Sequence, residues 1–314
     1  MLVRRSTLRS LIVLIVAVVL LGCGAAAPPP RPPPPTEVAH PIASPAPPQK
    51  MLPDGSRTIF PEHRLVGYCG TPGAPALGAL RGNLTARAKD MEKLAASYAG
   101  DRKVLPVFEL ISVIVMAAPG ADKKWRRRVP DTVVDDYLKA ARAAKAILLL
   151  NIQPGQSDFL TEVKAYERYL REPDVGVALD PEWAMWKADQ VPGSVYGRTT
   201  GEVINDVAAY LADLVRENDL PEKVLVFHQV NVHVLKDEAA IAAHPGVVII
   251  KSVDGRGYTG AKILTYHSLV DHLAPEVHPG FKLFFDEDVT IGGRLMGAKE
   301  VMSLSPVPEY VMYE

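Results

Sequence analysis

Short apolar segments recur along the chain from residue 64 onward, and most of them end in a polar residue. Continuous apolar runs of this length are typical of strands buried on both faces, and helical patterns fill most of the gaps between them. Strands that alternate with helices predict a parallel sheet. The predicted strands are 64–68, 104–109, 146–151, 175–180, 224–229, 247–251, 281–286 and 309–312.

Eight such units in about 250 residues match the arithmetic of a single (β/α)8 barrel, or TIM barrel. Helices are predicted over residues 84–99, 131–145 and 159–171, and from a cap at Thr200 to Asn218. The eighth strand is the last predicted element, so we expect a barrel without an eighth helix. Residues 51–63 are then expected to cover the face that this helix would protect.

The first residues predict an export signal rather than part of the fold. Three arginines precede the apolar run 11–21, which is shorter than the stretch of about 20 apolar residues typical of a transmembrane helix. Residues 20–23 read Leu-Leu-Gly-Cys, which resembles the bacterial lipobox, where cleavage before the cysteine leaves that residue lipid-modified. The resemblance implies a signal peptide over 1–22, lipid such as palmitate on Cys23, and a position on the extracytoplasmic face of the cell membrane. An uncleaved signal anchor is the alternative.

Residues 23–50 predict a linker between this anchor and the barrel domain, 51–314. Eleven prolines lie between residues 25 and 50, and this composition favours extended polyproline II structure, a semi-rigid spacer. After Cys23 only Cys69 remains, so the barrel has no pair of cysteines for a disulfide. The formal net charge of −1 gives no reason to expect nucleic-acid binding. We expect a monomer.

Polar and aromatic side chains stand at or just after several predicted strand ends. A TIM barrel carries its reactive groups at the carboxyl ends of its strands. A sugar ring stacks on flat aromatic faces while its hydroxyls form hydrogen bonds, although aromatic residues are equally ordinary at a barrel rim. The candidates for substrate binding are Tyr68, Glu109, Gln153, Trp183, His228 and Asp254.

Asp180 and Glu182, separated by a proline after the fourth predicted strand, are the sharpest local signal. Two acids two residues apart on a strand lie on the same face. Close carboxyls push their pKa values apart, so that one ionises while the other keeps its proton and serves as a general acid. The stretch 175–183 resembles the strand-four acidic motifs of chitinase-like and lysozyme-like glycoside hydrolase barrels. The alternative is that Asp180 only holds a loop through backbone hydrogen bonds.

The three adjacent acids Asp286, Glu287 and Asp288 follow the seventh predicted strand. In many retaining glycosidase barrels the acid comes from strand four and the nucleophile from strand seven. We therefore expect Asp286 or Glu287 to lie across the barrel mouth from Glu182, where carboxyls about 5 Å apart would form a retaining site and a wider gap would admit an inverting water. A solvated acidic loop is the alternative.

A divalent metal is a further alternative, with Glu109, Asp180, Asp254 and Asp286, together with His228, as oxygen and imidazole ligands. No short metal-ligand spacing appears in the sequence, and the ligands would come from separate strands. We therefore predict no metal and no other cofactor.

The chain from Tyr68 onward is also similar to an uncharacterised group of secreted or lipid-anchored barrel proteins of high-GC Gram-positive bacteria. This resemblance supports the fold and the exported location and leaves the reaction open. The stretches that carry it are 68–73, 108–109, 153–155, 179–183, 228–229 and 285–288.

The leading hypothesis is an exported lipoprotein that hydrolyses glycosidic bonds in a cell-envelope or extracellular polysaccharide. Its catalytic candidates are Asp180, Glu182, Asp286 and Glu287, and its partners are a carbohydrate and, through the lipid anchor, the membrane. Two alternatives stay open: a barrel that binds a glycan or envelope component without catalysis, and a metal-dependent phosphodiesterase-like hydrolase. Fold alone does not decide among them.

Overall fold

The computed structural model describes residues 49–271 and 273–314. The predicted signal peptide, Cys23 and nearly all of the proline-rich linker lie outside the described residues. Within the described part of the chain, no helix has the length and apolar character needed to cross a membrane.

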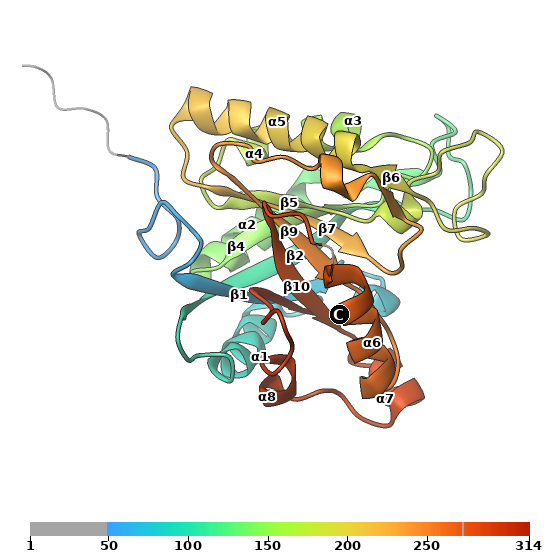
Figure 1. Cartoon of the computed structure of the whole chain (residues 1–314). Coiled ribbons are helices and arrows are strands. Elements are labelled where there is room, and N and C mark those ends of the chain that lie inside the picture. The colour runs from blue at the N-terminus through green and yellow to red at the C-terminus, as the bar shows by residue number, and fades with distance from the viewer. Residues whose placement is uncertain (1–48, 272) are drawn as a thin grey trace, which may run out of the picture. The chain divides into compact units, whose positions relative to one another are not determined.

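Eight parallel strands close into a barrel (Figure 1). Each strand pairs with the next along the chain, and the last returns to pair with the first, which confirms the predicted (β/α)8 fold. The barrel strands are β1 (His63–Gly70), β2 (Lys103–Val115), β4 (Ile147–Ile152), β5 (Val175–Leu179), β7 (Lys223–Gln229), β9 (Val247–Val253), β10 (Val277–Leu283) and β11 (Tyr310–Tyr313).

Helices fill most of the connections between the strands. Those that the pattern predicts are α1 (Leu84–Ala96), α2 (Asp131–Ala143), the pair α3 (Phe159–Lys164) and α4 (Glu167–Leu170), and α5 (Gly201–Asn218). The helices without a prediction are α6 (Thr259–Val270), α7 (Glu287–Gly292) and α8 (Ala298–Val301). The Thr200 side chain accepts a hydrogen bond from the Val203 N–H, as expected of the cap that begins α5.

The connection between β7 and β9 has no α-helix and is built from short elements. These and the other small elements are β3 (Arg126–Arg128), β6 (Thr199–Thr200), β8 (Leu235–Lys236) and the 3₁₀ turns η1 (Pro75–Leu77), η2 (Pro181–Trp183) and η3 (Glu238–Ala240). β6 and β8 pair with each other beyond the barrel. β2 continues past its predicted end to Val115, where β3 pairs with it in antiparallel register.

The seventh barrel strand, β10, begins and ends earlier than predicted. Its parallel register with β9 pairs Val277 with Ile249 and Phe281 with Val253. His278, Pro279 and Gly280 interrupt the apolar run, so the sequence pattern concealed the first half of the strand. As a result Asp286 lies beyond the strand, at the start of α7.

Residues 51–62 close the amino-terminal end of the barrel instead of covering its outer face, so that expectation was wrong. The side chains of Leu52 and Ile59 are buried, and the Ile59 N–H donates to the Glu222 carboxylate at 2.7 Å just before β7. The ring of Phe60 stacks on His278 of β10 with 4.2 Å between ring centres. The opposite, carboxyl-terminal end of the barrel remains available for a site.

Candidate active site

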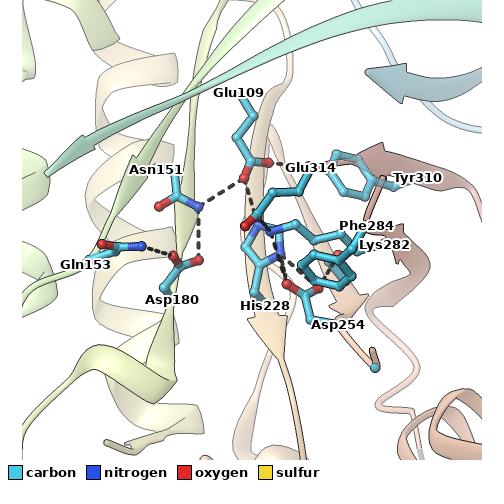
Figure 2. A network of polar contacts seen from close by, with 12 residues as sticks. Glu109, Asn151, Gln153, Asp180, His228, Asp254, Lys282, Phe284, Tyr310 and Glu314 are labelled. Carbon is cyan, nitrogen blue, oxygen red and sulfur yellow. Dashed lines mark hydrogen bonds and ion pairs between the residues drawn. The ribbon is translucent and has the colours of Figure 1, made fainter. Parts of the chain in front are cut away.

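Polar side chains from five barrel strands meet inside the barrel (Figure 2). Glu109 of β2 and Asn151 of β4 are both completely buried, and their side chains point toward each other in the interior. The Asn151 amide donates to Glu109 Oε1 at 3.0 Å and to Asp180 Oδ1 at 2.9 Å. The Tyr310 hydroxyl of β11 donates to the other oxygen of Glu109. Asn151 therefore joins the second and fourth strands of the barrel through their carboxylates.

His228 of β7 lies between two carboxylates in the same interior. Its Nδ1 donates to Asp254 Oδ1 at 3.0 Å, and its Nε2 is 3.0 Å from Glu109 Oε1 in ion-pair contact without the geometry of a hydrogen bond. Lys282 Nζ of β10 lies 3.2 Å from Asp254 Oδ2 and 2.6 Å from Glu314 Oε2. Each of these charges has at least one opposite charge beside it.

This pairing overcomes the effect of burial on the acids. Burial by itself would raise the pKa of Glu109, but the charges of His228 and Lys282 lower it to about 2. The same two cations hold the pKa of Asp254 below its usual value against the effect of burial. Burial opposes the charged form of His228, and the Asp254 and Glu109 carboxylates outweigh it and raise the histidine pKa well above its usual value. The interior is thus a compensated ionic cluster.

Asp180 and Glu182 form a different pair at the end of β5. The Asp180 carboxylate accepts hydrogen bonds from Asn151 and, at 3.1 Å, from the Gln153 amide. The turn η2 then places Glu182, whose Oε2 is buried and has no hydrogen-bond partner among the described residues. Burial, followed by the nearby charges of Asp180 and Asp254, raises the pKa of Glu182 well above its usual value. The surroundings of Glu182 therefore favour its protonated form.

A cavity of about 620 Å³, here called the main cavity, opens at this end of the barrel. Asp180, Glu182, Asp254 and Lys282 line it together with Gln153, and its apolar lining includes Trp183, Tyr196 and Phe284. Pockets of this size accept small ligands or a few sugar units. The main cavity thus combines a neutral acid, charged groups and aromatic side chains.

The acids after β10 separate in the structure. Glu287 lines the main cavity, as Glu182 does. Asp286 is exposed and instead lines a neighbouring cavity of about 380 Å³, here called the side cavity. Asp288 is buried and accepts from the backbone N–H groups of Gly257 and Phe284. Of the two carboxyls expected to share a cavity with Glu182, only Glu287 does so.

The remaining predicted site residues fall into two groups. Gln153, Trp183 and Asp254 line the main cavity, and Tyr68 lines the side cavity. Glu109 and His228 are completely buried beneath these cavities and would reach a ligand only through the residues that they hold.

Sequence reasoning missed Asn151, Lys282, Tyr310 and Glu314 as members of the site. Asn151 is a polar residue at the end of a predicted strand, which is the signal that identified the other candidates. Lys282 lay within the predicted seventh strand, whose bounds were wrong. A lysine among apolar residues, two positions from Phe284 and so on the same face of the chain, was the signal of a charge that faces the barrel interior. The seventh barrel strand therefore brings a lysine to the main cavity in addition to the carboxyl of Glu287 that follows it.

The described residues contain no group of three or more His, Cys, Asp or Glu side chains placed to hold a metal ion. Cys69 is buried, and burial raises the pKa of its thiol well above the usual value. Both observations direct attention to the carboxyls of the main cavity.

No protein-family model and no curated protein sequence matches the chain. Among solved structures it is similar to a GH18 chitinase from Pseudoalteromonas aurantia, with a TM-score of 0.35 and 10% sequence identity over 79% of this chain and 93% of that one. With so low a TM-score and identity, the similarity gives no information about the substrate or the reaction of this chain. The barrel fold itself is established by the strand pairing.

Proposed function

We propose that the protein is a glycoside hydrolase in which Glu182 is the general acid. The observation that carries the proposal is the Glu182 carboxyl, whose Oε2 is buried without a partner beside a second acid and on the wall of a cavity. A neutral carboxylic acid in this position holds a proton that it can give to a ligand. Perturbed titratable groups in a cavity mark functional sites more often than structural ones.

In the proposed reaction Glu182 donates its proton to the glycosidic oxygen while the bond between that oxygen and the anomeric carbon breaks. Asp180 lines the same cavity and stabilises the positive charge that develops on the sugar ring. A solvent water then forms a bond to the anomeric carbon. Glu287, which lines the same cavity and carries no ion pair, accepts the proton of the water, and exchange with solvent restores both acids.

The lining of the main cavity supports a carbohydrate as the substrate. Trp183 and Tyr196 present aromatic rings within the same cavity as Glu182, and Tyr196 is 60% exposed. Flat rings beside carboxyls match the two faces of a sugar, whose C–H groups stack and whose hydroxyls form hydrogen bonds. We propose a polysaccharide of the cell envelope or the surroundings as the substrate class.

The test is hydrolysis of a panel of envelope and extracellular glycans by the wild type and by Glu182→Gln. General acid catalysis contributes about 10²–10⁴-fold, so the variant is expected to lose most of its turnover while its melting temperature and glycan binding stay close to wild type. Asp189→Asn is the matched control, because Asp189 is an exposed acid of the same loop that lines neither cavity. A loss of melting temperature in step with activity would assign Glu182 a structural role.

Glycan binding without catalysis is the second candidate, and one observation favours it. Asp254 is paired with His228 and Lys282, Glu314 is paired with Lys282, and Asp286 lies in the side cavity. Apart from Asp180 and Glu182 themselves, Glu287 is then the one carboxyl of the main-cavity lining without an ion pair among the described residues. If the wild type binds a member of the panel without cleaving it, and Glu182→Gln binds it equally well, this candidate replaces the hydrolase.

The location on the extracytoplasmic face of the membrane remains part of the proposal. It rests on the sequence around Cys23, and two acyl chains suffice for stable anchoring where one is marginal. Cys23→Ser is expected to release the protein from the membrane fraction or to block its processing. Unchanged processing and membrane retention would contradict a lipid on Cys23.

A further inference from the structure

The side cavity adjoins the main cavity. The two cavities share Ala76, Glu287 and Glu314 in their linings. A volume of about 380 Å³ accepts a substituent of a few non-hydrogen atoms. A ligand held beside Glu182 can therefore extend a side group into the side cavity.

One side of the side cavity is basic. Arg81 lies between η1 and α1, and its Nε donates to the Gly78 carbonyl oxygen at 3.2 Å. This contact fixes the guanidinium group, and its two terminal nitrogens have no hydrogen-bond partner among the described residues. Arg87 of α1 is paired with Asp90 at 3.2 Å on the same side. Arg81 is thus the unpaired cation of the side cavity.

The other side of the side cavity is acidic. Asp286 and Glu287 stand at the start of α7, and the Asp286 side chain makes no capping hydrogen bond. Within the described residues, neither acid lies within 4.0 Å of a cationic side chain, so neither pairs with Arg81 or Arg87. Opposite charges therefore line the same cavity without pairing with each other, and each of them is available to a ligand.

Tyr68 of β1 gives an independent indication of a ligand. Its side chain is only 6% exposed, yet it lines the side cavity. Burial raises the pKa of its hydroxyl, and Asp90 and Arg87 of the same cavity lining are the nearby charges that act on it. This hydroxyl has no hydrogen-bond partner among the described residues. The ring is thus buried while the hydroxyl is open to the cavity, where it can hydrogen-bond a ligand.

We propose that the side cavity binds an amino-acid-like group with both a free ammonium and a free carboxylate. The carboxylate lies at Arg81 and the Tyr68 hydroxyl, and the ammonium lies at Asp286. A ligand with only one charge meets one side of like sign, which disfavours it. The inference rests on the proposed function for its meaning: the substrate is a glycan that carries amino-acid substituents.

Three small probes test the side cavity without requiring hydrolysis. Nε-acetyl-lysine carries both charges, its methyl ester carries only the ammonium, and Nα,Nε-diacetyl-lysine carries only the carboxylate. Their binding to the full-length chain is measured by ligand-observed NMR titration. We expect the doubly charged probe to bind with a Kd of about 1 mM and the others about fivefold more weakly, the effect of one partly exposed ion pair.

Two variants assign the charges to residues. Arg81→Gln is expected to abolish the preference over the methyl ester, and Asp286→Asn is expected to abolish the preference over the diacetyl probe. Arg216→Gln is the control, because Arg216 is an exposed arginine of α5 that lines neither cavity. Equal binding of the three probes, or no binding at millimolar concentration, would overturn the proposal.

The result is separable from the proposed hydrolysis. If the panel glycans are not cleaved but the probes show the expected preference, the side cavity stands as a binding site and the hydrolase falls. If glycans are cleaved and the probes do not bind, the hydrolase stands and the amino-acid site falls.

Discussion

The barrel interior and the wall of the main cavity treat buried charge in opposite ways. In the interior, His228 and Lys282 face Glu109 and Asp254, and every charge has a partner. At the cavity wall, Glu182 lies near Asp180 and has one buried carboxyl oxygen without a hydrogen-bond partner among the described residues. In the first arrangement the charged forms are favoured by their partners, and in the second the protonated form of Glu182 is favoured by burial and by nearby like charges. The feature that distinguishes the candidate active site from the barrel interior is therefore an acid without a partner, and not the number of charged residues.

The largest expected effect comes from removing a partner inside the barrel. Lys282→Met leaves the carboxylates of Asp254 and Glu314 without their cation, and breaking a buried pair in this way costs about 3–5 kcal/mol of the free energy of unfolding. Denaturant unfolding measures this loss. Lys299→Met, at an exposed lysine of α8, is the control and is expected to unfold like the wild type. Equal stability of the two variants would show that the interior pairs contribute little.

The pH dependence of hydrolysis sharpens the contrast at the cavity wall. Because the pKa of Glu182 is raised, kcat/KM is expected to fall about tenfold per pH unit above that pKa, where the acid has lost its proton. Asp180→Asn removes the like charge and is expected to move this alkaline limb to lower pH, to the extent that Asp180 adds to burial. A limb that stays in place in Asp180→Asn would identify a different acid. The measurement is the pH profile of kcat/KM for both proteins.

The raised pKa of Glu182 also makes the free energy of unfolding depend on pH. The folded state keeps a proton on Glu182 that the unfolded chain, with a pKa near 4.5, releases. Glu182 therefore lowers the free energy of unfolding as the pH rises from about 4.5 through its folded pKa. Glu109 acts in the opposite direction, because its pKa of about 2 makes the wild type lose stability as the pH falls from 4.5 towards 2. Denaturant unfolding of the wild type and Glu182→Gln from pH 4.5 upwards checks the effect of Glu182, because the variant should not show this loss of stability.

The smallest expected effect is at Asp286. Its carboxyl is exposed and lies in the side cavity, so Asp286→Asn is expected to change hydrolysis of an unsubstituted glycan by no more than about twofold, as for surface substitutions generally. Initial rates beside those of wild type measure this. A loss as large as that of Glu182→Gln would place Asp286 at the reacting atoms and restore the strand-seven nucleophile that the sequence suggested.

Much of the site was accessible to sequence reasoning because it depends on local order. The Asp-Pro-Glu segment ends a strand whose pattern is unambiguous, and the position of Glu182 in the main cavity follows from that end. Of the two acids predicted as alternatives after the seventh strand, Glu287 lines the main cavity and Asp286 only the side cavity. The reason is local as well: His278, Pro279 and Gly280 hide the start of β10, and a strand that begins four residues early also ends before Asp286.

By itself the sequence determined the alternation of strands and helices, the order of the strands around the barrel and the end at which the polar residues gather, because periodicity and chain order are local properties. Only the tertiary structure decided which charges meet. Lys282 pairs with Asp254 and Glu314, Asn151 bridges Glu109 and Asp180, and Glu182 Oε2 has no hydrogen-bond partner among the described residues. Such contacts depend on the register between strands that lie far apart in the chain.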